Sequence, residues 1–563
     1  MKRPKRWRIH SQDKDLATKL ASKIEQSEIL SQLLINRGVK TLQHAFEMVG
    51  KAVSIAQFST EKLNAVLTLI NTAIDQKKPI LLYGDYDVDG MTSTSIMVKA
   101  ITLLGGVVRY KIPHRFDQGY GLSMDIVDLV KNENIGLLIT LDCGVTNVAE
   151  IDALKEQTDV NVVVIDHHQL PDQIPKYDAM LNPKELEEDD PLFHLCTAGI
   201  VFKFVEFLAL EYERINPKEY IDLAAIGTIA DIATLQGENR RIVSEGLIIL
   251  SKTSHRGLQS LLQRAGFENP FVTARDIGFV IAPRLNAAGR LSSAQYGVEL
   301  LLSKDQEHAF QISSKLELMN NDRRALDKKM LEECIEMIEA DPDFYDHDVL
   351  VLGKKGWHAG VIGITASKLV DRYSKPVVIV AIDDDIARGS ARSFGDVSIY
   401  HILKKCKQFF TKFGGHKQAA GFSLKPENFD AFQAFMFDTA VKEISPEQLY
   451  DFLAVDMTIN SEDISLDLAE ELMLLEPYGM GNEEPLFYSN GFRVVDFKAV
   501  GDGTHLKATF VSKKTSKTVD AIGFGLADKI SLLYKDDIHL VFSLDINNWK
   551  NKKSLQLKLK DIK

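Results

Sequence analysis

The chain has 563 residues, of which 45% are hydrophobic and 26% are charged, as is typical of a globular protein with several domains. Its formal net charge of −12 argues against a protein covered in positive charge, but nucleic-acid binding depends on local charge and stays open. Four scattered cysteines form no CxxC pair, which argues against a disulfide framework or a zinc finger. No apolar run approaches the roughly 18 residues of a membrane helix. The N-terminus lacks the apolar core of a secretory signal, so we expect a cytoplasmic protein without a membrane partner.

The first half of the chain shows one clear alternation of strands and helices. Residues 1–75 are polar and helical in pattern, without a motif. Between 76 and 235, short apolar runs alternate with helical patterns, which predicts a doubly wound parallel sheet. The predicted strands cover residues 79–83, 107–112, 136–141 and 161–165.

The second half predicts a long helix, another α/β domain and a small barrel. Residues 236–345 are mostly helical, and the charged, proline-free stretch from Gln306 to Ala340 is typical of a long connecting helix. A second α/β domain is expected over 346–445. Residues 446–563 end in short strands with period-two alternation, which favours a β-barrel. The expected fold class is therefore α/β, with two α/β domains joined by a long helix and followed by a barrel.

The stretch LLYGDYDVDGMTST, residues 81–94, carries Asp85, Asp87 and Asp89 at alternating positions, followed by Gly90. An EF-hand calcium loop begins in the same way, but its twelfth position requires a bidentate Glu, and here that position is Ile96. The apolar run before the acids indicates a buried strand rather than a helix. The acids therefore follow a strand and precede a helix, which is where open α/β sheets place their ligands.

Acidic side chains also follow two later strands. Asp142 follows LLITL, and Asp166 follows NVVVI with His167 and His168 beside it. Parallel strands point their carboxyl ends to one edge of the sheet, so we expect these groups to converge. A lone Asp at such a place is more often a helix cap or a turn residue. The whole cluster instead favours a bound cation, and oxygen ligands with an imidazole suit Mg²⁺ or Mn²⁺ better than zinc.

Asp231, in AAIGTIADIATL, has small, apolar neighbours that suggest a buried helix. From this stretch alone, a satisfied capping residue and a metal ligand are equally good interpretations.

These motifs together resemble a known family. GDYDVDG, LDCG, IDHH and Asp231 follow the order of the four motifs of the DHH phosphoesterase superfamily, and FTKFGGHKQAAGFSL resembles the GGH motif of its associated domain. With IAPRLNAAGRLSSA, GWHAGVIGITASKL and the C-terminal LEPYGMGNEEPLF, GDGTHLKATF, AIGFG and LQLKLKDIK, they resemble the RecJ family of single-strand-specific exonucleases, from about residue 40 to the end. The resemblance implies that the barrel is of the oligonucleotide-binding (OB) type.

The resemblance also implies two bound ions, Mn²⁺ or Mg²⁺, and a ligand set for each. One ion would be held by Asp85, Asp87 and Asp142. The other would be held by Asp89, Asp142, His167 and Asp231, so that Asp142 bridges. His168 would face the scissile phosphate or support the site from behind.

A second set of residues is expected to hold the substrate. ARGSARS suggests a small-residue turn that presents hydroxyl and guanidinium donors to a phosphate. The resemblance assigns this region to the 5′-terminal phosphate, which makes Ser390 and Arg392 the candidates. Arg115 and Arg290 are further candidates, although a surface salt bridge explains either equally well. Gly414, Gly415 and His416 would add a close backbone approach and an imidazole.

The barrel is expected to grip the strand with basic and aromatic side chains. Most of its Phe residues are expected in the core, because strand alternation buries one face. The aromatic candidates are Phe487, Tyr488, Phe492, Phe497 and Trp549, with lysines from Lys498 to the C-terminus.

The resemblance implies a metal-dependent 5′→3′ exonuclease that degrades single-stranded DNA to 5′-mononucleotides in DNA repair and recombination. A helicase and the single-strand-binding protein are the expected partners. A DHH phosphoesterase for small substrates is an alternative, but the length and the barrel argue against it. A binding scaffold with an eroded site is another, but every motif acid is present. A haloacid-dehalogenase-type phosphatase would not explain the DHH triplet.

Overall fold

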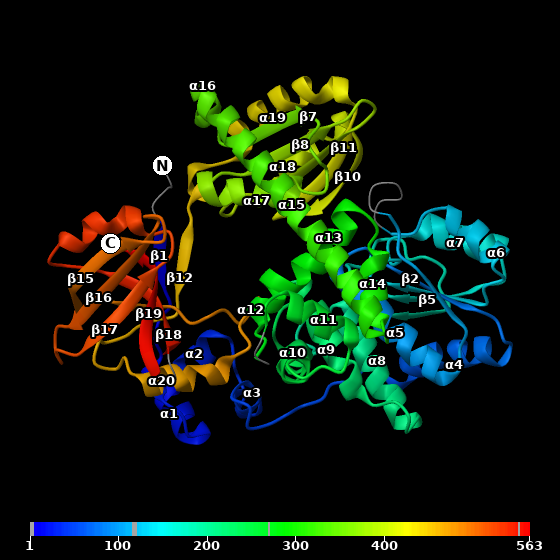
Figure 1. Cartoon of the computed structure of the whole chain (residues 1–563), viewed down its shortest axis with the longest axis horizontal. Helices are drawn as coiled ribbons and strands as arrows, with labels where there is room; N and C mark the ends of the chain where they lie inside the picture. Colours follow the sequence, from blue (N-terminus) through cyan, green and yellow to red (C-terminus); the bar gives the residue numbers. More distant parts are fainter. Residues whose placement is uncertain (1–4, 115–120, 268–270, 550–551) are drawn as a thin grey trace. The chain divides into compact units, whose positions relative to one another are not determined.

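The computed structural model describes residues 5–114, 121–267, 271–549 and 552–563. Its contacts divide the chain into two units, each of which is described by itself. Unit 1 comprises Met1–Ala45, Asp322–Leu474 and Pro485–Lys563, and unit 2 comprises Phe46–Asn321 and Leu475–Glu484. Figure 1 shows the elements of both units in the colours of the sequence. Among the described residues, no helix is long and apolar enough to cross a membrane.

Unit 2 is built on a five-stranded sheet in which every pair of neighbours is parallel, in the order β3-β2-β4-β5-β6. The four predicted strands are confirmed, and a fifth, β6, was not predicted because its three residues are too short to form a pattern. The strands are β2 (Ile80–Gly84), β3 (Val108–Lys111), β4 (Leu137–Leu141), β5 (Asn161–Ile165) and β6 (Ala179–Leu181).

Helices cover both faces of this sheet, as a doubly wound fold requires. Ile80 and Leu82 of β2 pack into the core with α4 (Thr60–Asp75) and α5 (Val88–Leu104). Leu81 and Tyr83 pack into a second core with α6 (Asp125–Asn132) and α7 (Val148–Gln157). Figure 1 shows these two pairs of helices on opposite sides of the sheet.

The remaining helices of unit 2 follow the sheet in the chain and enlarge the first core. They are α8 (Thr197–Glu211), α9 (Ile221–Ala230), α10 (Gly237–Leu250), α11 (Arg256–Arg264), α12 (Ala274–Asp276), the π-helix η3 (Ile277–Ile281), α13 (Ala282–Leu291) and α14 (Gln295–Leu302). The predicted long helix is confirmed as α15 (Gln306–Ala340), which begins in unit 2 and ends in unit 1.

Unit 1 contains the second α/β sheet, in the order β10-β11-β9-β8-β7. β7 and β8 are parallel, and the other neighbours are antiparallel. One face packs against α17 and the second half of α15, and the other packs against α18 and α19. The elements are α16 (Pro342–Asp346), β7 (Leu350–Lys355), α17 (Ile362–Tyr373), β8 (Val377–Ile382), β9 (Ala387–Arg392), α18 (Ile399–Lys405), β10 (Phe410–His416), β11 (Ala419–Leu424) and α19 (Phe429–Glu443).

The C-terminal part of unit 1 is a seven-stranded sheet in the order β13-β14-β18-β19-β17-β16-β15, which contains the short alternating strands predicted there. Its elements are β13 (Met457–Thr458), α20 (Leu466–Leu472), β14 (Phe487–Ser489), β15 (Phe492–Val500), β16 (His505–Ser512), β17 (Thr518–Gly523), β18 (Leu540–Trp549) and β19 (Lys552–Ile562).

The N-terminal residues are helical, as predicted, in α1 (Lys14–Ile24), α2 (Glu28–Asn36) and α3 (Leu42–Met48). A short strand was not predicted: β1 (Arg6–Ile9) pairs in parallel with β12 (Phe452–Val455). The partner of β1 lies more than 400 residues away in the chain, so no local pattern could indicate the pairing.

Candidate metal centre

The three acids after β2 are held by a tight reversal of the chain into α5. A Cβ atom at Gly90 would lie 2.3 Å from the carbonyl oxygen of Asp85, so only glycine fits this turn. Asp87 caps α5, because its Oδ1 accepts a hydrogen bond from the Gly90 N–H at 3.1 Å. Asp89 lies in the first turn of α5 and is buried.

The carboxylate of Asp89 is fixed by the start of α8. Its two oxygens accept hydrogen bonds from the backbone N–H groups of Thr197 and Ala198, at 2.8 and 2.7 Å. A helix N-terminus stabilises negative charge, so this contact orients Asp89 and favours its ionised form. α9 also lies close, because a Cβ atom at Gly227 would lie 3.1 Å from Oδ1 of Asp89. Small residues in α9 therefore allow a helix to reach the carboxylates.

Asp142 and His167 follow the neighbouring strands β4 and β5, and the structure brings them into contact. The Nε2 atom of His167 lies 3.2 Å from Oδ1 of Asp142, and its Nδ1 atom lies 3.8 Å from Oδ2 of Asp231. Asp231 follows the last residue of α9. The Thr197 hydroxyl donates a hydrogen bond to Oδ1 of Asp142 at 3.1 Å. Asp231 therefore reaches the same edge of the sheet as Asp142 and His167, which follow the strands.

His168 is oriented by a further carboxylate, that of Asp166. Its Nδ1 lies 2.7 Å from Oδ1 of the buried Asp166, which also accepts hydrogen bonds from the backbone N–H groups of His167 and His168. The other oxygen of Asp166 accepts from the Val145 N–H. Asp166 therefore shapes the loop after β5 and orients the His168 ring.

Three groups of donor atoms lie within 4.8 Å of one another: Asp85, Asp87 and Asp142; Asp89, His167 and Asp231; and Asp142, His167 and His168. The first two groups are the cores of the two predicted ligand sets. Asp142 belongs to the first set and touches His167 of the second, which is the position a bridging ligand needs. Carboxylate oxygens with one imidazole fit Mg²⁺ or Mn²⁺, so the residues present suit the expected ions.

The buried carboxylates of the centre repel one another, and a bound cation would relieve this repulsion. Burial, followed by the charges of Asp89 and Asp87, raises the pKa of Asp231 to about 9. Burial and the charge of Asp89 raise the pKa of Asp142 well above its usual range. Burial and the charge of Asp87 raise the pKa of Asp89 to about 6, against the opposing effect of the Ala198 and Thr197 N–H groups. Carboxylates that repel one another in this way are stabilised by a divalent ion.

The two histidines differ in charge. Burial, followed by the charge of His168, lowers the pKa of His167 to about 3, so its imidazole is neutral and can coordinate a metal. Burial also lowers the pKa of His168, but the hydrogen bond and the negative charge of Asp166 outweigh it, and the net shift is upward. His168 is therefore the better proton donor of the pair.

A cavity of about 330 Å³ opens onto this centre. Asn286 and Arg290 of α13 line it together with the acids, so a guanidinium, a group that binds phosphate, shares the cavity with them. α13 can approach because a Cβ atom at Gly289 would lie 2.6 Å from the carbonyl oxygen of Tyr86. The complete lining is Asp85, Tyr86, Asp87, Asp142, His167, His168, Ala230, Asp231, Asn286 and Arg290.

Some functional residues here were not predicted. Thr197 and Asn286 contact the site residues or line the cavity, but neither was singled out from the sequence. Asn286 had a signal, because it lies four residues before Arg290 and so shares its helix face. No sequence signal marks Thr197, since its contacts come from the packing of α8 against α5. The predicted Arg115 lies outside the described residues.

The predicted phosphate-binding residues of unit 1 lie on a strand, and the expected turn at ARGSARS is wrong. In β9, Ala387, Gly389 and Ala391 are buried, and the three polar residues face the other side. The small residues serve packing, because a Cβ atom at Gly389 would lie 2.1 Å from the Phe422 ring. Period-two alternation of small and polar residues was the available signal for a strand.

Ser390 and Arg392 meet the start of α17. Arg392 donates hydrogen bonds from Nη1 to the Ser390 hydroxyl at 3.0 Å and to the Ala391 carbonyl at 2.8 Å. A Cβ atom at Gly363 would lie 2.7 Å from Nη2 of Arg392 and 3.0 Å from Oγ of Ser390. A hydroxyl, a guanidinium and a helix N-terminus therefore share one place, and each of these groups binds phosphate.

Gly414, Gly415 and His416 of the GGH motif lie on β10, which is separated from β9 by the single strand β11. Gly421 pairs with both Ser390 and Gly414, and Ala419 pairs with both Arg392 and His416. Gly415 has a φ of +149°, and a Cβ atom there would lie 2.5 Å from the Ala419 carbonyl oxygen, so this position requires glycine. The glycines of the motif thus allow β10 to pair closely with β11, the strand that also pairs with Ser390 of β9.

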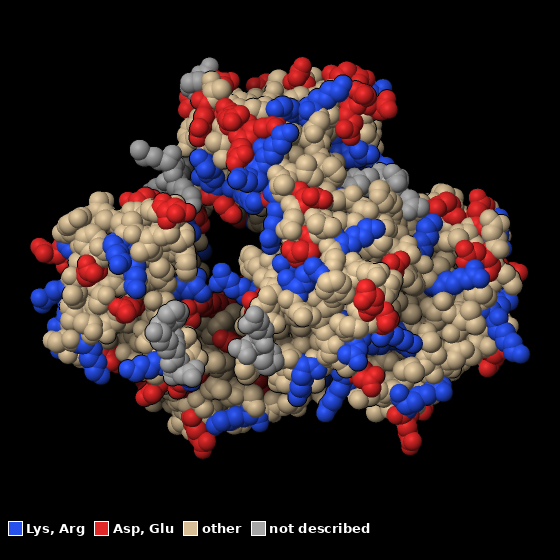
Figure 2. Space-filling model, viewed as in Figure 1, with Lys and Arg blue, Asp and Glu red and all other residues tan. Residues whose placement is uncertain are grey.

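The candidate aromatic residues of the C-terminal sheet are mostly not exposed. Phe487 and Phe492 are buried, Tyr488 is half-buried and bonded to His539, and Phe497 is half-buried against Tyr534. The Trp549 side chain lies outside what the structure describes. The lysines form a row across strands, because Lys498 pairs with Lys507, Lys507 pairs with Ile522, and Ile522 pairs with Lys558. In Figure 2, blue and red residues are interspersed over the visible face of this sheet.

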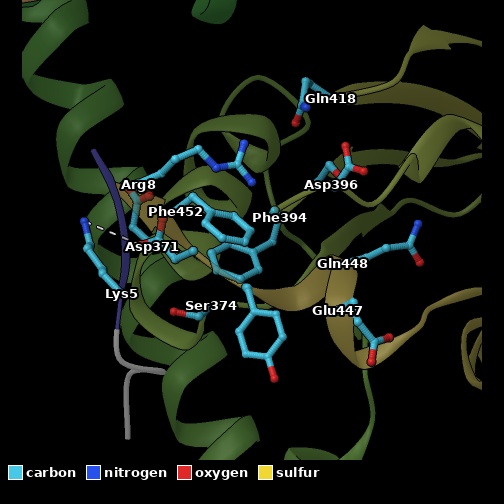
Figure 3. Close-up of a pocket in the computed structure, with 14 residues that line it drawn as sticks. Lys5, Arg8, Asp371, Ser374, Phe394, Asp396, Gln418, Glu447, Gln448 and Phe452 are labelled. Atoms are coloured by element: carbon cyan, nitrogen blue, oxygen red, sulfur yellow. Dashed lines mark ion pairs between the residues drawn. The ribbon is translucent and has the colours of Figure 1, made fainter. Parts of the chain in front are cut away.

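A second pocket, of about 950 Å³, lies within unit 1 (Figure 3). Phe394 and Phe452 stand at its centre and Arg8 extends beside them. Lys5 pairs with Asp451 at 3.5 Å. Four carboxylates outnumber the two cations, so its charge does not favour a phosphate. The lining is Lys5, Arg8, Asp371, Ser374, Ser393, Phe394, Gly395, Asp396, Gln418, Glu447, Gln448, Tyr450, Asp451 and Phe452.

The parallel sheet and the acidic centre at its carboxyl edge define a metal-dependent phosphoesterase of the DHH class. The family model of the DHH N-terminal domain matches residues 79–228, and that of the DHHA1 domain matches 346–442. The model of the RecJ OB domain matches residues 455–561, which confirms the predicted OB type. With the relatives described next, these matches show that the chain belongs to the RecJ family.

The chain is 34% identical over 562 residues to the single-stranded-DNA-specific exonuclease RecJ of Bacillus subtilis, covering 99% of this chain and 70% of that protein. It is 32% identical over 518 residues to the exonuclease of the same name from Haemophilus influenzae, covering 88% and 89%. The structure of Thermus thermophilus RecJ with Mn²⁺ superposes with a TM-score of 0.84 at 29% identity, covering 99% of this chain and 79% of that one. A structure of that protein with Mg²⁺ also matches, with a TM-score of 0.78 at 28% identity, covering 99% and 78%.

Proposed function

We propose that this chain is a metal-dependent 5′→3′ exonuclease that degrades single-stranded DNA to 5′-mononucleotides. The observation that carries the proposal is the convergence of two donor sets around Asp142, in one cavity with Arg290. The chain's RecJ relatives, which carry the name of single-stranded-DNA-specific exonucleases, support the substrate.

Asp85, Asp87 and Asp142 would hold one divalent ion, and Asp89, Asp142, His167 and Asp231 would hold the other; bound there, the ions would supply a water of lowered pKa and stabilise negative charge on the leaving oxygen. The chain's own residues prepare the site for them. Thr197 fixes Asp142 between the two sets, and the start of α8 holds Asp89. Neutral His167 offers a ring nitrogen to the metal.

The side of the cavity that Arg290 lines would receive the substrate phosphate. Arg290 would orient a phosphate oxygen through charge-assisted hydrogen bonds. His168, oriented by Asp166, would donate a hydrogen bond or a proton to the phosphate or to the leaving oxygen. No protein nucleophile is needed in this scheme.

Ser390 and Arg392, with the start of α17, would hold the 5′-terminal phosphate, and Gly414, Gly415 and His416 would support this site. The OB domain would hold the strand further from its end. Arg115 remains a candidate companion of Arg290. The predicted domain limits, cytoplasmic location, partnership with a helicase and a single-strand-binding protein, and role in DNA repair and recombination stay predictions.

The direct test is digestion of end-labelled oligonucleotides with Mn²⁺, Mg²⁺ or EDTA. Single strands labelled at the 5′ end should release labelled mononucleotide at once, whereas strands labelled at the 3′ end should shorten progressively. Blunt duplexes and EDTA samples should stay intact. Release of the 3′ label first would contradict the polarity, and equal digestion of duplexes would contradict the strand preference.

A further inference from the structure

Two large apolar side chains are exposed on segments of unit 2 that adjoin residues of the metal centre in the chain. Ile232 directly follows Asp231, and its exposed fraction is 65%. Phe279 lies in the π-helix η3, and its exposed fraction is 73%. Single exposed apolar residues are ordinary on a protein surface, but these two lie in unusual backbone conformations, a left-handed residue and a π-helix.

Ile232 occupies a position that is normally glycine. α9 ends with a hydrogen bond from the Ile232 N–H to the Ile229 carbonyl and one from the Ala233 N–H to the Thr228 carbonyl, both at 3.1 Å. This is a Schellman end, and it requires a left-handed residue, here Ile232 with a φ of +59°. A β-branched residue is strained in that region, and strained residues persist mainly at functional sites. Isoleucine at this position therefore lowers stability while it places an apolar side chain beside a metal ligand.

Phe279 is carried on the helix that lines the cavity. η3 continues directly into α13, and Phe279 lies seven residues before Asn286 on this continuous helical segment. The rise of a helix puts the two about 10 Å apart along its axis. π-turns within helices often mark functional sites. The segment also lies against the end of α9, since a Cβ atom at Gly278 would lie 3.9 Å from Cγ2 of Ile229.

An exposed cation accompanies the ring. The guanidinium of Arg275, in α12, lies 5.8 Å from the centroid of the Phe279 ring. Exposed aromatic rings beside arginine are how proteins stack the bases of single-stranded nucleic acid without reading their sequence. Asn286 and Arg290, which line the cavity, are on α13, and Phe279 precedes them on the same helical segment. A strand with its phosphate in the cavity would therefore pass the Phe279 ring.

We propose that Ile232 and Phe279, here called the apolar rim, pack against the nucleobases next to the phosphate in the metal centre. The occupant is a nucleobase of a single strand, because the cavity beside the rim has the chemistry of a phosphate site. Bases in a duplex are already stacked and cannot lie flat on the rim, so the rim selects single strands at the site of cleavage. This inference rests on the proposed function and adds residues that recognise the base.

The test compares 5′-phosphorylated single strands whose first nucleotides either carry bases or are abasic. Cleavage with Mn²⁺ and binding in EDTA are both measured for wild type, Phe279→Ala and Ile232→Gly. Wild type should prefer the strand with bases. Phe279→Ala should lose roughly 5- to 150-fold in kcat/KM on that strand, the range of base stacking on an aromatic ring. Ile232→Gly should also lose activity on it, and both variants should lose far less on the abasic strand. Ile248→Ala in α10, whose exposed fraction is 63%, is the control and should keep the wild-type preference.

Two further measurements separate base contact from other roles of Ile232. The melting temperature of Ile232→Gly should equal or exceed that of wild type, because the left-handed strain is removed. Its Mn²⁺ affinity should be unchanged. A loss of Mn²⁺ affinity that matches the loss of activity would make Ile232 a positioning residue for Asp231 and would overturn the inference. An unchanged preference for bases in both variants would also overturn it. Absent cleavage by wild type would instead contradict the proposed function, and the binding ratio would still decide the role of the rim.

Discussion

His167 and Asp142 stand 3.2 Å apart, from Nε2 to Oδ1, at the ends of two neighbouring parallel strands. Neither residue can be explained by packing alone, because a buried carboxylate with a raised pKa and a neutral histidine do not form a stabilising ion pair. The pair makes sense as two ligands of one ion. Asp142, which also belongs to the donor set of Asp85 and Asp87, is then the residue on which both ions depend.

Asp142→Ala should abolish cleavage and leave a folded protein. The substitution removes the shared ligand, so both ions lose affinity together. Calorimetric titration with Mn²⁺ should show the loss of both binding events, whereas circular dichroism should be unchanged. Normal turnover by a folded Asp142→Ala protein would disprove the scheme with two ions.

Thr197→Val should weaken the centre without touching a ligand. The valine keeps the shape but removes the hydroxyl that donates to Asp142. Loss of such an orienting contact typically costs about 10- to 100-fold in metal affinity or activity. Thr197→Ser keeps the hydroxyl and serves as the matched control. Equal activity of the valine and serine variants would show that the Thr197 hydroxyl does not orient Asp142.

The strand-end residues of the centre were predictable because the sequence pattern marks where strands end. Asp85, Asp142 and His167 each follow an apolar run, and parallel pairing brings such ends together. Asp231 was ambiguous from its own stretch, because its role depends on α9 reaching Asp89 through Gly227, which is a matter of packing. The rim was not predictable for the same reason: exposure and a positive φ are properties of the folded chain.

The boundary between the units shows another limit of sequence patterns. Leu475–Glu484 lies within the predicted C-terminal domain but belongs to unit 2. Arg240 of α10 donates to the carbonyl oxygens of Leu475 and Glu476, and the Leu235 N–H donates to the Met480 carbonyl. Deleting the chain from about residue 450 would therefore remove part of unit 2, and single substitutions are the sounder test of the C-terminal sheet.

The metal-free protein should lose stability as the pH rises from 7 to 9. The pKa of Asp231 is about 9 in the folded state against 3.8 ordinarily, so between these values the folded chain holds a proton that the unfolded chain has released. Stability falls with pH where the folded state binds more protons. The window lies above the range in which histidines titrate.

The melting temperature in EDTA, followed across this range, checks the prediction. Asp231→Asn should flatten the dependence, because the amide does not titrate. Saturating Mg²⁺ should also flatten it, because the ion replaces the proton and stabilises the folded state. A melting temperature in EDTA that rises between pH 7 and 9 would contradict the assignment.

Arg392→Ala should reduce recognition of the 5′ end more than the chemistry. Its guanidinium stands with Ser390 at the start of α17, and a lost charge-assisted contact to phosphate is worth about 1.5–3 kcal/mol. The variant should lose its preference for 5′-phosphorylated over 5′-hydroxyl strands. Arg388→Ala is the matched control, because Arg388 lies on the same face of β9 and pairs with Asp383 at 3.4 Å. If Arg392→Ala and Arg388→Ala lost the preference for 5′-phosphorylated strands equally, the 5′-phosphate would have to bind at another site.

Lys498→Ala combined with Lys507→Ala should weaken binding to long single strands and should not destabilise the fold. The two lysines face each other directly across β15 and β16, and like charges in that position are destabilising unless an anion lies between them. A bound phosphate is such an anion, and each neutralised phosphate contributes a salt slope of about −0.7 for a single strand. The double variant should therefore show lower affinity and a shallower salt dependence, while cleavage of a very short oligonucleotide stays close to wild type. Lys535→Ala, an exposed lysine outside this row, is the control. Equal affinities and equal salt slopes for all three proteins would show that the row of lysines is an ordinary solvated surface and that the strand is gripped elsewhere.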